Sequence, residues 1–257
     1  MSVLDSIIQA SYKRAETLST DLLTEAALKK NTLDFAQALK RKQGKIQLIA
    51  ELKRRSPSLG VLNAAISVPE AIRLYEPFAA ALSILTEPEH FNGSIDDLRE
   101  ARRLTNLPLL RKDFIVDKKQ IAEARLVGAN SFLLIVAALS NAQLVDLLQY
   151  GRSLEMEPLI EVHNAEELNR ALQHNIRILG VNNRNLHTLA IDLQTTPTLI
   201  AQIPIERQKE LVLVAESGYS TREQLNAIPN SIDAVLIGTG FMGSEDPAKK
   251  LSALFGT

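Results

Sequence analysis

The chain has 257 residues, of which 46% are apolar and 23% are charged, and its formal net charge is −1. This balance is ordinary for a globular protein and predicts no general attraction to nucleic acid or to an anionic membrane. The sequence contains no cysteine, which excludes disulfides, thiolate catalysis and cysteine-based zinc sites.

No segment of the sequence is typical of a membrane span or of a secretion signal. The longest apolar run covers residues 132–139, far short of the ~20 residues that a transmembrane helix needs. Residues 1–16 are amphipathic and lack the apolar centre of a signal peptide. We therefore expect a cytoplasmic protein.

The first 44 residues are predicted to be helical and to precede the first strand. They are charged throughout, and we interpret them as an N-terminal helical extension of the domain that follows. Beyond them, short apolar runs have the length and composition of buried strands. These eight runs cover residues 46–50, 81–85, 107–110, 132–138, 158–162, 176–181, 211–215 and 232–237.

Amphipathic segments with helical periodicity separate the predicted strands. Examples are residues 118–127, 141–152 and 164–173, the last of which begins with Asn164, a residue type that favours a helix start.

Alternating strands and helices predict parallel βαβ units. A doubly wound sheet usually has fewer than eight strands, whereas eight units in a chain of this length match a (β/α)₈ or TIM barrel. We therefore predict a single (β/α)₈ barrel domain over residues 1–257, with residues 1–44 as its helical extension.

Polar side chains stand at the carboxyl ends of several predicted strands. They are Glu51 and Lys53, Lys112, Glu161, Asn182 and Glu216. In a (β/α)₈ barrel these strand ends converge on one mouth, where the active site lies. Buried charges are costly unless they are paired or used, so charges from four strands at one mouth indicate an active site.

The alternation of side chains along the first strand predicts where its charges point. The even-numbered positions from 48 to 52 are apolar and are expected to face the surrounding helices. Ile49, Glu51 and Lys53 share the other face, which we expect to point into the barrel and its mouth. The alternative interpretation is that Glu51 and Lys53 form a purely structural ion pair.

Glycine-rich loops follow the seventh and eighth predicted strands, where TIM barrels commonly bind phosphate. Gly218 follows the seventh strand, and Gly238, Gly240 and Gly243 follow the eighth. Glycines also serve ordinary turns, so each loop alone is weak evidence. Ser56, in the loop after the first strand, offers a further hydroxyl donor.

The histidines show no spacing that predicts a metal site. The chain has four, at positions 90, 163, 174 and 187. His163 lies near the predicted mouth, and we interpret it as a structural residue with satisfied hydrogen bonds.

Motifs in order along the chain resemble the indole-3-glycerol phosphate synthase family. They are IAELKRRSPSLG, LTEPEHFNGS, LLRKDFIVDKKQIAEARLVGA, EPLIEVHNAEEL, GVNNRNL and VAESGY. The resemblance implies a (β/α)₈ barrel with an N-terminal helical extension. It also implies conversion of 1-(2-carboxyphenylamino)-1-deoxyribulose 5-phosphate into indole-3-glycerol phosphate, CO2 and water. This step of tryptophan biosynthesis needs no metal or organic cofactor.

Three details depart from the family pattern. Leu59 replaces the usual lysine after the Ser-Pro-Ser motif, GTGFM replaces the more common GSSLM or GESLM, and a glycine usual before the second strand is missing. The first two changes concern the expected phosphate end, whereas the ionisable set is intact.

The resemblance also implies a role for each charged residue. Lys112 is expected to protonate the substrate ketone as the ring closes, and Glu161 to stabilise positive charge on the anilino ring. Lys53 and Glu51 are expected to serve as acid and base in dehydration, although the two pairs could exchange roles.

The remaining residues are expected to bind the substrate. Asn182 and Glu216 would hold its hydroxyls or orient the lysines, and Arg184 would meet its carboxylate. Side chains expected to clasp the aromatic ring are those of Phe91, Phe114 and Leu133. The phosphate is expected to lie against Ser56, Ser217, Gly218, Gly238 and Thr239.

Two alternatives stay open at this point. One is another phosphosugar barrel enzyme such as phosphoribosylanthranilate isomerase, which in its family uses a cysteine that this chain lacks. The other is a non-catalytic barrel subunit. The expected partner is a small phosphorylated substrate, with no nucleic acid or membrane, and the expected assembly is a monomer or a weak homodimer.

Overall fold

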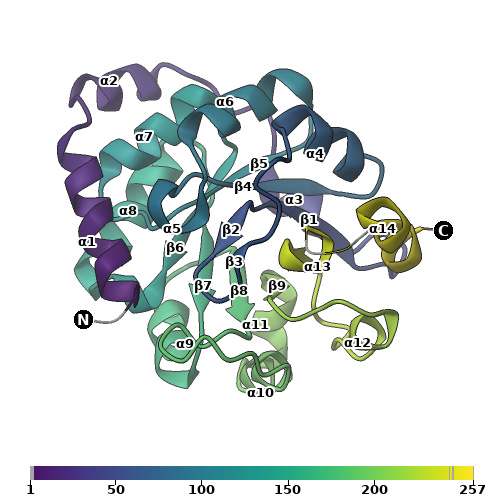
Figure 1. Cartoon of the computed structure of the whole chain (residues 1–257). Helices are drawn as coiled ribbons and strands as arrows, with labels where there is room; N and C mark the ends of the chain where they lie inside the picture. Colours follow the sequence, from purple (N-terminus) through teal and green to yellow (C-terminus); the bar gives the residue numbers. More distant parts are fainter. Residues whose placement is uncertain (1–2, 243, 245, 257) are drawn as a thin grey trace.

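The computed structural model describes residues 3–242, 244 and 246–256 and shows a closed barrel of eight parallel strands surrounded by helices (Figure 1). The barrel closes where the first strand pairs with both the second and the last. Its strands are β1 (Gln47–Leu52), β4 (Ala81–Leu85), β5 (Leu109–Lys112), β6 (Ser131–Ile135), β7 (Leu159–Val162), β8 (Ile178–Asn182), β9 (Val212–Glu216) and β10 (Ala234–Ile237). The predicted (β/α)₈ fold is therefore confirmed.

Helices connect successive strands and cover the outside of the barrel (Figure 1). They are α4 (Val68–Tyr75), α6 (Ile95–Leu104), α7 (Lys118–Val127), α8 (Asn141–Ser153), α9 (Ala165–Leu172), α10 (Thr195–Ile200), α11 (Ile205–Glu210), α12 (Arg222–Asn226) and α14 (Pro247–Phe255). Single turns follow three of the strands: α5 (Pro88–Phe91), η1 (Val136–Ala138) and α13 (Thr239–Met242).

Local sequence signals explain where these helices begin. Ser67 and Glu70 form a capping box at the start of α4, and Ser140 and Gln143 form one at the start of α8. Each box satisfies backbone N–H groups that have no partner within the first turn. Asn164 caps α9 by accepting a hydrogen bond from the backbone of Glu167, as its residue type predicts.

Side chains from alternate strand positions fill the barrel interior. Ile49, Leu110, Leu133 and Leu159 belong to one buried apolar cluster inside the barrel. Positions 48, 50 and 52 of β1 instead pack with the surrounding helices in a second cluster. The predicted directions of the two faces of β1 are thus confirmed.

Four strands extend further toward the mouth than predicted, β8 and β9 by one residue and β1 and β5 by two. β1 includes Glu51 and Leu52, and β5 includes Arg111 and Lys112. The predicted β1 and β5 end before their first charged residue, because charged side chains are usually exposed. Here Glu51 and Arg111 are buried, and Lys112 is largely buried. β5 also begins later than predicted, after Pro108, which has no N–H to donate to a neighbouring strand.

A small antiparallel sheet in the loop after β1 was not predicted. It pairs β2 (Arg55–Ser56) with β3 (Gly60–Val61), and Gly60 supplies the left-handed turn conformation, with φ +67°. The hairpin lies at the barrel mouth (Figure 1).

The predicted N-terminal extension is helical and contacts the barrel at both ends and on its side. It consists of α1 (Val3–Glu16), α2 (Asp21–Ala27) and α3 (Phe35–Leu39). α2 packs on α7, and α3 buries apolar side chains at the amino ends of β1 and β4. α1 packs Leu4 and Ile7 into the apolar cluster that includes Phe114. Because the three helices bury apolar surface against the barrel, we propose that extension and barrel form one domain.

Candidate active site

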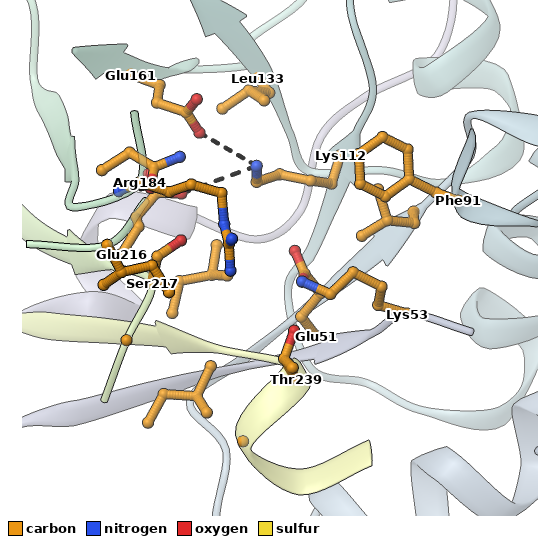
Figure 2. Close-up of a pocket in the computed structure, with 18 of the residues that line it drawn as sticks. Glu51, Lys53, Phe91, Lys112, Leu133, Glu161, Arg184, Glu216, Ser217 and Thr239 are labelled. Carbon is orange, nitrogen blue, oxygen red and sulfur yellow. Dashed lines mark hydrogen bonds and ion pairs between the residues drawn. The ribbon is translucent and has the colours of Figure 1, made fainter. Parts of the chain in front are cut away.

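A cavity of about 260 Å³ opens at the carboxyl ends of the barrel strands. Figure 2 shows the charged side chains converging on it from different strands. The predicted residues that line it are Glu51, Lys53, Phe91, Lys112, Phe114, Leu133, Glu161, Asn182, Arg184, Glu216, Ser217, Gly218, Gly238 and Thr239. The barrel thus brings together residues that are up to 188 positions apart, from 51 to 239.

Lys112 lines this cavity and lies between two buried carboxylates. Its Nζ is 3.1 Å from Oε2 of Glu161 and 3.8 Å from Oε2 of Glu216 (Figure 2). The side chain of Lys112 is 14% exposed, and both carboxylates are almost fully buried. The ammonium of Lys112 therefore offsets part of the negative charge of a site that contains more glutamates than lysines.

Glu51 and Lys53 form a second ion pair that lines the same cavity. Lys53 Nζ is 2.6 Å from Oε1 of Glu51, and both side chains are largely buried. This contact agrees with the structural-pair interpretation, but both residues also line the cavity. The pair is therefore accessible to a ligand.

Neighbouring charges set the protonation of this cluster. Burial alone would lower the pKa of Lys112, but the nearby carboxylates of Glu161, Glu216 and Glu51 outweigh it and raise that pKa above its usual value. Burial likewise opposes ionisation of Glu161, yet Lys112 and His163 outweigh it and hold the pKa of this carboxyl well below its usual range. Lys112 is therefore an ammonium and Glu161 a carboxylate at neutral pH.

Glu216 behaves in the opposite way. Burial and the negative charge of Glu161 raise the pKa of Glu216 well above its usual value, and Lys112 offsets this only in part. Two neighbouring carboxyl groups whose pKa values move apart can serve as acid and base in the same site. Glu161 is better suited to stabilise a positive charge, whereas Glu216 retains its proton more readily.

Two glycines make room for these carboxylates. A β-carbon on Gly180 would lie 2.2 Å from Oε1 of Glu216, and one on Gly238 would lie 2.5 Å from Oε1 of Glu51. Real β-carbons do not approach oxygen atoms this closely. A larger residue at either position would therefore displace a charged side chain of the site.

The aromatic and amide residues line the same cavity as the charges. The rings of Phe91 and Phe114 are tilted against each other with centroids 6.1 Å apart. Asn182 accepts a hydrogen bond from the backbone of Arg184 (3.0 Å), and the guanidinium of Arg184 donates to Ser58 Oγ (3.0 Å). Arg184 thereby ties the loop after β8 to the loop after β1.

Ser56 is the one predicted binding residue that does not line this cavity. It lines a smaller neighbouring cavity of about 80 Å³ together with Leu4 and Ile7 of α1. Its hydroxyl accepts a hydrogen bond from the backbone of Leu59. Leu59, the departure from the family pattern, does line the main cavity.

A buried network on either side of Lys112 was missed by the sequence analysis. Arg111 donates to Thr86 Oγ1 and pairs with Asp113, and Asp113 accepts from Thr86 and from Arg14 of α1. Arg111 and Asp113 are at most 4% exposed. Strand alternation could have predicted that Arg111 points away from Lys112. It could not have predicted that Arg14 reaches Asp113 from a position 99 residues away.

Within residues 3–242, 244 and 246–256, no group of three or more His, Cys, Asp or Glu side chains is arranged to hold a metal ion. In the same part of the chain, each helix is too short or too polar to cross a membrane. Gly243 of the predicted phosphate loop lies outside the described residues.

The closed barrel and the charged cavity at the carboxyl ends of its strands define a TIM-barrel enzyme. Residues 4–254 match the family model described as indole-3-glycerol phosphate synthase. The chain belongs to this family.

Relatives that carry the name indole-3-glycerol phosphate synthase match most of the chain. One from Polaromonas naphthalenivorans is 44% identical over 88% of this chain and 86% of its own. Another from Bordetella pertussis is 42% identical over 97% of this chain and 94% of its own. One from Streptococcus gordonii is 39% identical over 98% of this chain and 96% of its own.

Solved structures with low sequence identity share the fold. A chain of the tryptophan synthase α2β2 complex from Pyrococcus furiosus has a TM-score of 0.61 at 15% identity, over 84% of this chain and 100% of that chain. The 3-hexulose-6-phosphate synthase from Salmonella typhimurium has a TM-score of 0.59 at 10% identity, over 81% of this chain and 96% of that chain. Both are similar in fold alone.

Proposed function

We propose that this chain catalyses the reaction of its family, the conversion of 1-(2-carboxyphenylamino)-1-deoxyribulose 5-phosphate into indole-3-glycerol phosphate, CO2 and water. In this reaction an aromatic carbon attacks a ketone, CO2 leaves that carbon, and the resulting hydroxyl leaves as water. The observation that carries the proposal is the buried Lys112–Glu161 pair at 3.1 Å, which faces the cavity. Family membership favours the synthase over the isomerase alternative.

Lys112 is suited to the ring-closing step. As the carbon–carbon bond forms, the ketone oxygen develops into an alkoxide, which a nearby ammonium stabilises electrostatically. The raised pKa of Lys112 does not oppose proton transfer, because an alkoxide is more basic than an amine. We therefore assign Lys112 as the group that donates a proton to this oxygen.

Glu161 is suited to the charge on the other side of the new bond. Ring attack leaves positive charge on the anilino system until CO2 departs. The lowered pKa of Glu161 keeps its carboxylate ionised, so it can stabilise that charge within a buried site. Lys53 and Glu51, paired at 2.6 Å, are assigned to the proton transfers of dehydration.

The remaining contacts follow from the shape of the cavity. We assign the substrate phosphate to the loops after β9 and β10, which contain Ser217, Gly218, Gly238 and Thr239. Phe91, Phe114 and Leu133 supply the apolar wall for the aromatic ring. The hydroxyl groups of the substrate are assigned to Asn182 and Glu216, and its carboxylate to Arg184. Ser56, the remaining predicted phosphate contact, lines a different cavity.

The proposal extends to the assembly and the location of the protein. The near-neutral charge and the biosynthetic reaction agree with a cytoplasmic protein that acts on a small phosphorylated substrate. We propose a monomer or a weak homodimer in tryptophan biosynthesis, which analytical ultracentrifugation at several concentrations would test.

The direct test is to add the carboxyphenylamino substrate to the purified protein and to follow the indole fluorescence of the product. We expect turnover by the wild type and a loss of at least about 100-fold in Glu161→Gln. Lys118→Gln, which alters a surface ion pair outside the cavity, is the matched control and should turn over normally. Absence of product with the folded wild type would favour a non-catalytic barrel.

A further inference from the structure

His163 is the first residue after β7 and stands two positions beyond Glu161. Because side chains alternate along a strand, this spacing places both on the same side of the chain. The side chain of His163 is 6% exposed. It does not line the main cavity, so it lies behind Glu161 as seen from a bound substrate.

The imidazole lies between two carboxylates. Its Nε2 is 3.1 Å from Oε1 of Glu161, and its Nδ1 is 2.9 Å from Oε2 of Glu167. The first contact is an ion pair whose angles are not those of a hydrogen bond, because Nε2 has no hydrogen-bond partner within the described residues. In the described part of the chain, these are the charged groups that contact His163, one from β7 and one from α9.

Glu167 is itself held in place by the first turn of α9. Its carboxylate accepts hydrogen bonds from the backbone N–H of His163 (2.8 Å) and from the side-chain amide of Asn164 (2.6 Å). Its own backbone N–H donates to Asn164 Oδ1. This carboxylate is therefore a fixed anchor for the imidazole.

We propose that His163 is a positioning residue that holds Glu161 ionised and turned toward Lys112. Oε1 of Glu161 faces His163, and Oε2 faces Lys112 at 3.1 Å. With both oxygens engaged, the carboxylate has one favoured orientation. The inference rests on the proposed function, because it concerns the role of Glu161 in that reaction.

The order of charges along this line supports the proposal. It reads carboxylate, imidazolium, carboxylate, ammonium and carboxyl, from Glu167 through His163, Glu161 and Lys112 to Glu216. Burial lowers the pKa of His163, but the carboxylates on its two sides outweigh this and raise it to about 9. The imidazole is therefore cationic at neutral pH and lies between two carboxylates, and the Glu161 carboxylate in turn lies between two cations.

The experiment compares His163→Gln with the wild type and with His174→Gln, which follows α9 at the far end of the barrel. A residue that orients a metal ligand from behind typically changes activity about 10- to 100-fold when it is mutated. His163 stands in a similar relation to the carboxylate of Glu161. We therefore expect kcat of His163→Gln to fall about 10-fold with little change in KM. Loss of a nearby cation should also move the acid limb of the kcat profile upward by roughly one pH unit. His174→Gln should change neither quantity.

Glu167→Gln provides a second variant in case His163→Gln does not fold. It keeps the size of the anchor but removes its charge, and we expect a smaller shift of the acid limb in the same direction. If folded variants keep kcat within about threefold and leave the acid limb in place, His163 has only a structural role. That outcome leaves the proposed function intact, whereas an inactive wild type would overturn the function itself.

Discussion

Gly238, the residue after β10, lies directly against Glu51 of the neighbouring strand β1. A β-carbon at this position would come within 2.5 Å of Oε1 and 3.0 Å of the β-carbon of Glu51. The glycine therefore makes room for the carboxylate, in addition to its place in the loop that we propose to bind phosphate. A substitution here does not test phosphate binding alone.

The first prediction separates these two effects. Gly238→Ala should lower kcat as well as raise KM, because the methyl group displaces Glu51. Thr239→Val removes only a hydroxyl from the same loop, so it should raise KM about threefold or more with kcat nearly unchanged. Steady-state kinetics with inorganic phosphate as a competitor measures both. A Thr239→Val protein with normal KM and normal phosphate inhibition would argue against a phosphate contact at Thr239.

The second prediction concerns Lys112→Met, which keeps the stem of the side chain but deletes its charge and proton. General acid catalysis is typically worth about 10²–10⁴-fold, and we expect kcat to fall by at least the lower value. If the variant folds normally and turns over within about threefold of the wild type, Lys53 becomes the better candidate for the acid.

The same variant should also be less stable, in a pH-dependent manner. Without Lys112, Glu161 and Glu216 lose their shared cation, and their folded-state pKa values rise. A carboxyl group whose pKa is raised on folding costs stability above its unfolded pKa and costs none when it is protonated. We expect a loss of roughly 1–3 kcal/mol near neutral pH, since His163 still faces Glu161, and a smaller loss near pH 4. Thermal melts at the two pH values would show the difference, and an equal loss at both would contradict it.

The third prediction concerns His163 and the stability of the fold. Its pKa is raised from 6.5 to about 9, so its contribution is fully present below 6.5 and is lost as the pH rises through about 9. We expect the wild type to be more stable than His163→Gln by up to ~3 kcal/mol near pH 6. This advantage should largely disappear near pH 10. Urea unfolding of both proteins across this range provides the measurement, and a difference that does not vary with pH would show that the imidazole is not charged.

The fourth prediction concerns metal ions. Both the resemblance to the family and the proposed chemistry assign every proton transfer and charge to amino-acid side chains, so activity should be unchanged in excess EDTA. Activity that is lost with EDTA and restored by zinc or magnesium would contradict a mechanism based on side chains alone.

Local periodicity was sufficient to predict the fold and the charged residues at the strand ends that line the cavity. Glu51 follows Ile49 by two positions, and Lys112 follows Leu110 in the same way, so the apolar residue inside the barrel predicts the direction of the charge above it. Because both residues stand at the carboxyl ends of barrel strands, they were expected at the same mouth. Phe91 depended on the resemblance, because an aromatic residue in a loop has no periodic signal.

Contacts between distant segments were beyond such reasoning. Arg14 reaches Asp113 across 99 positions, and the clash that only glycine avoids at position 238 depends on how the barrel closes. His163 was interpreted as structural because sequence spacing does not show that its ring lies between two carboxylates. The resemblance implies a phosphate contact for Ser56, but this residue of the hairpin β2–β3 lines another cavity.

The way the barrel closes also determines when the site can form. Gln47 on β1 pairs with Ala234 on β10, so the ring of strands stays open until nearly the whole chain has been synthesised. Such long-range pairing has a large loop-closure entropy cost and slows folding. Helices and the first strands can form earlier, but Glu51 meets Gly238 only at the final closure. During refolding, helical circular dichroism should therefore recover before enzymatic activity, and the open edges of β1 and β10 are the surfaces at which incomplete chains would aggregate.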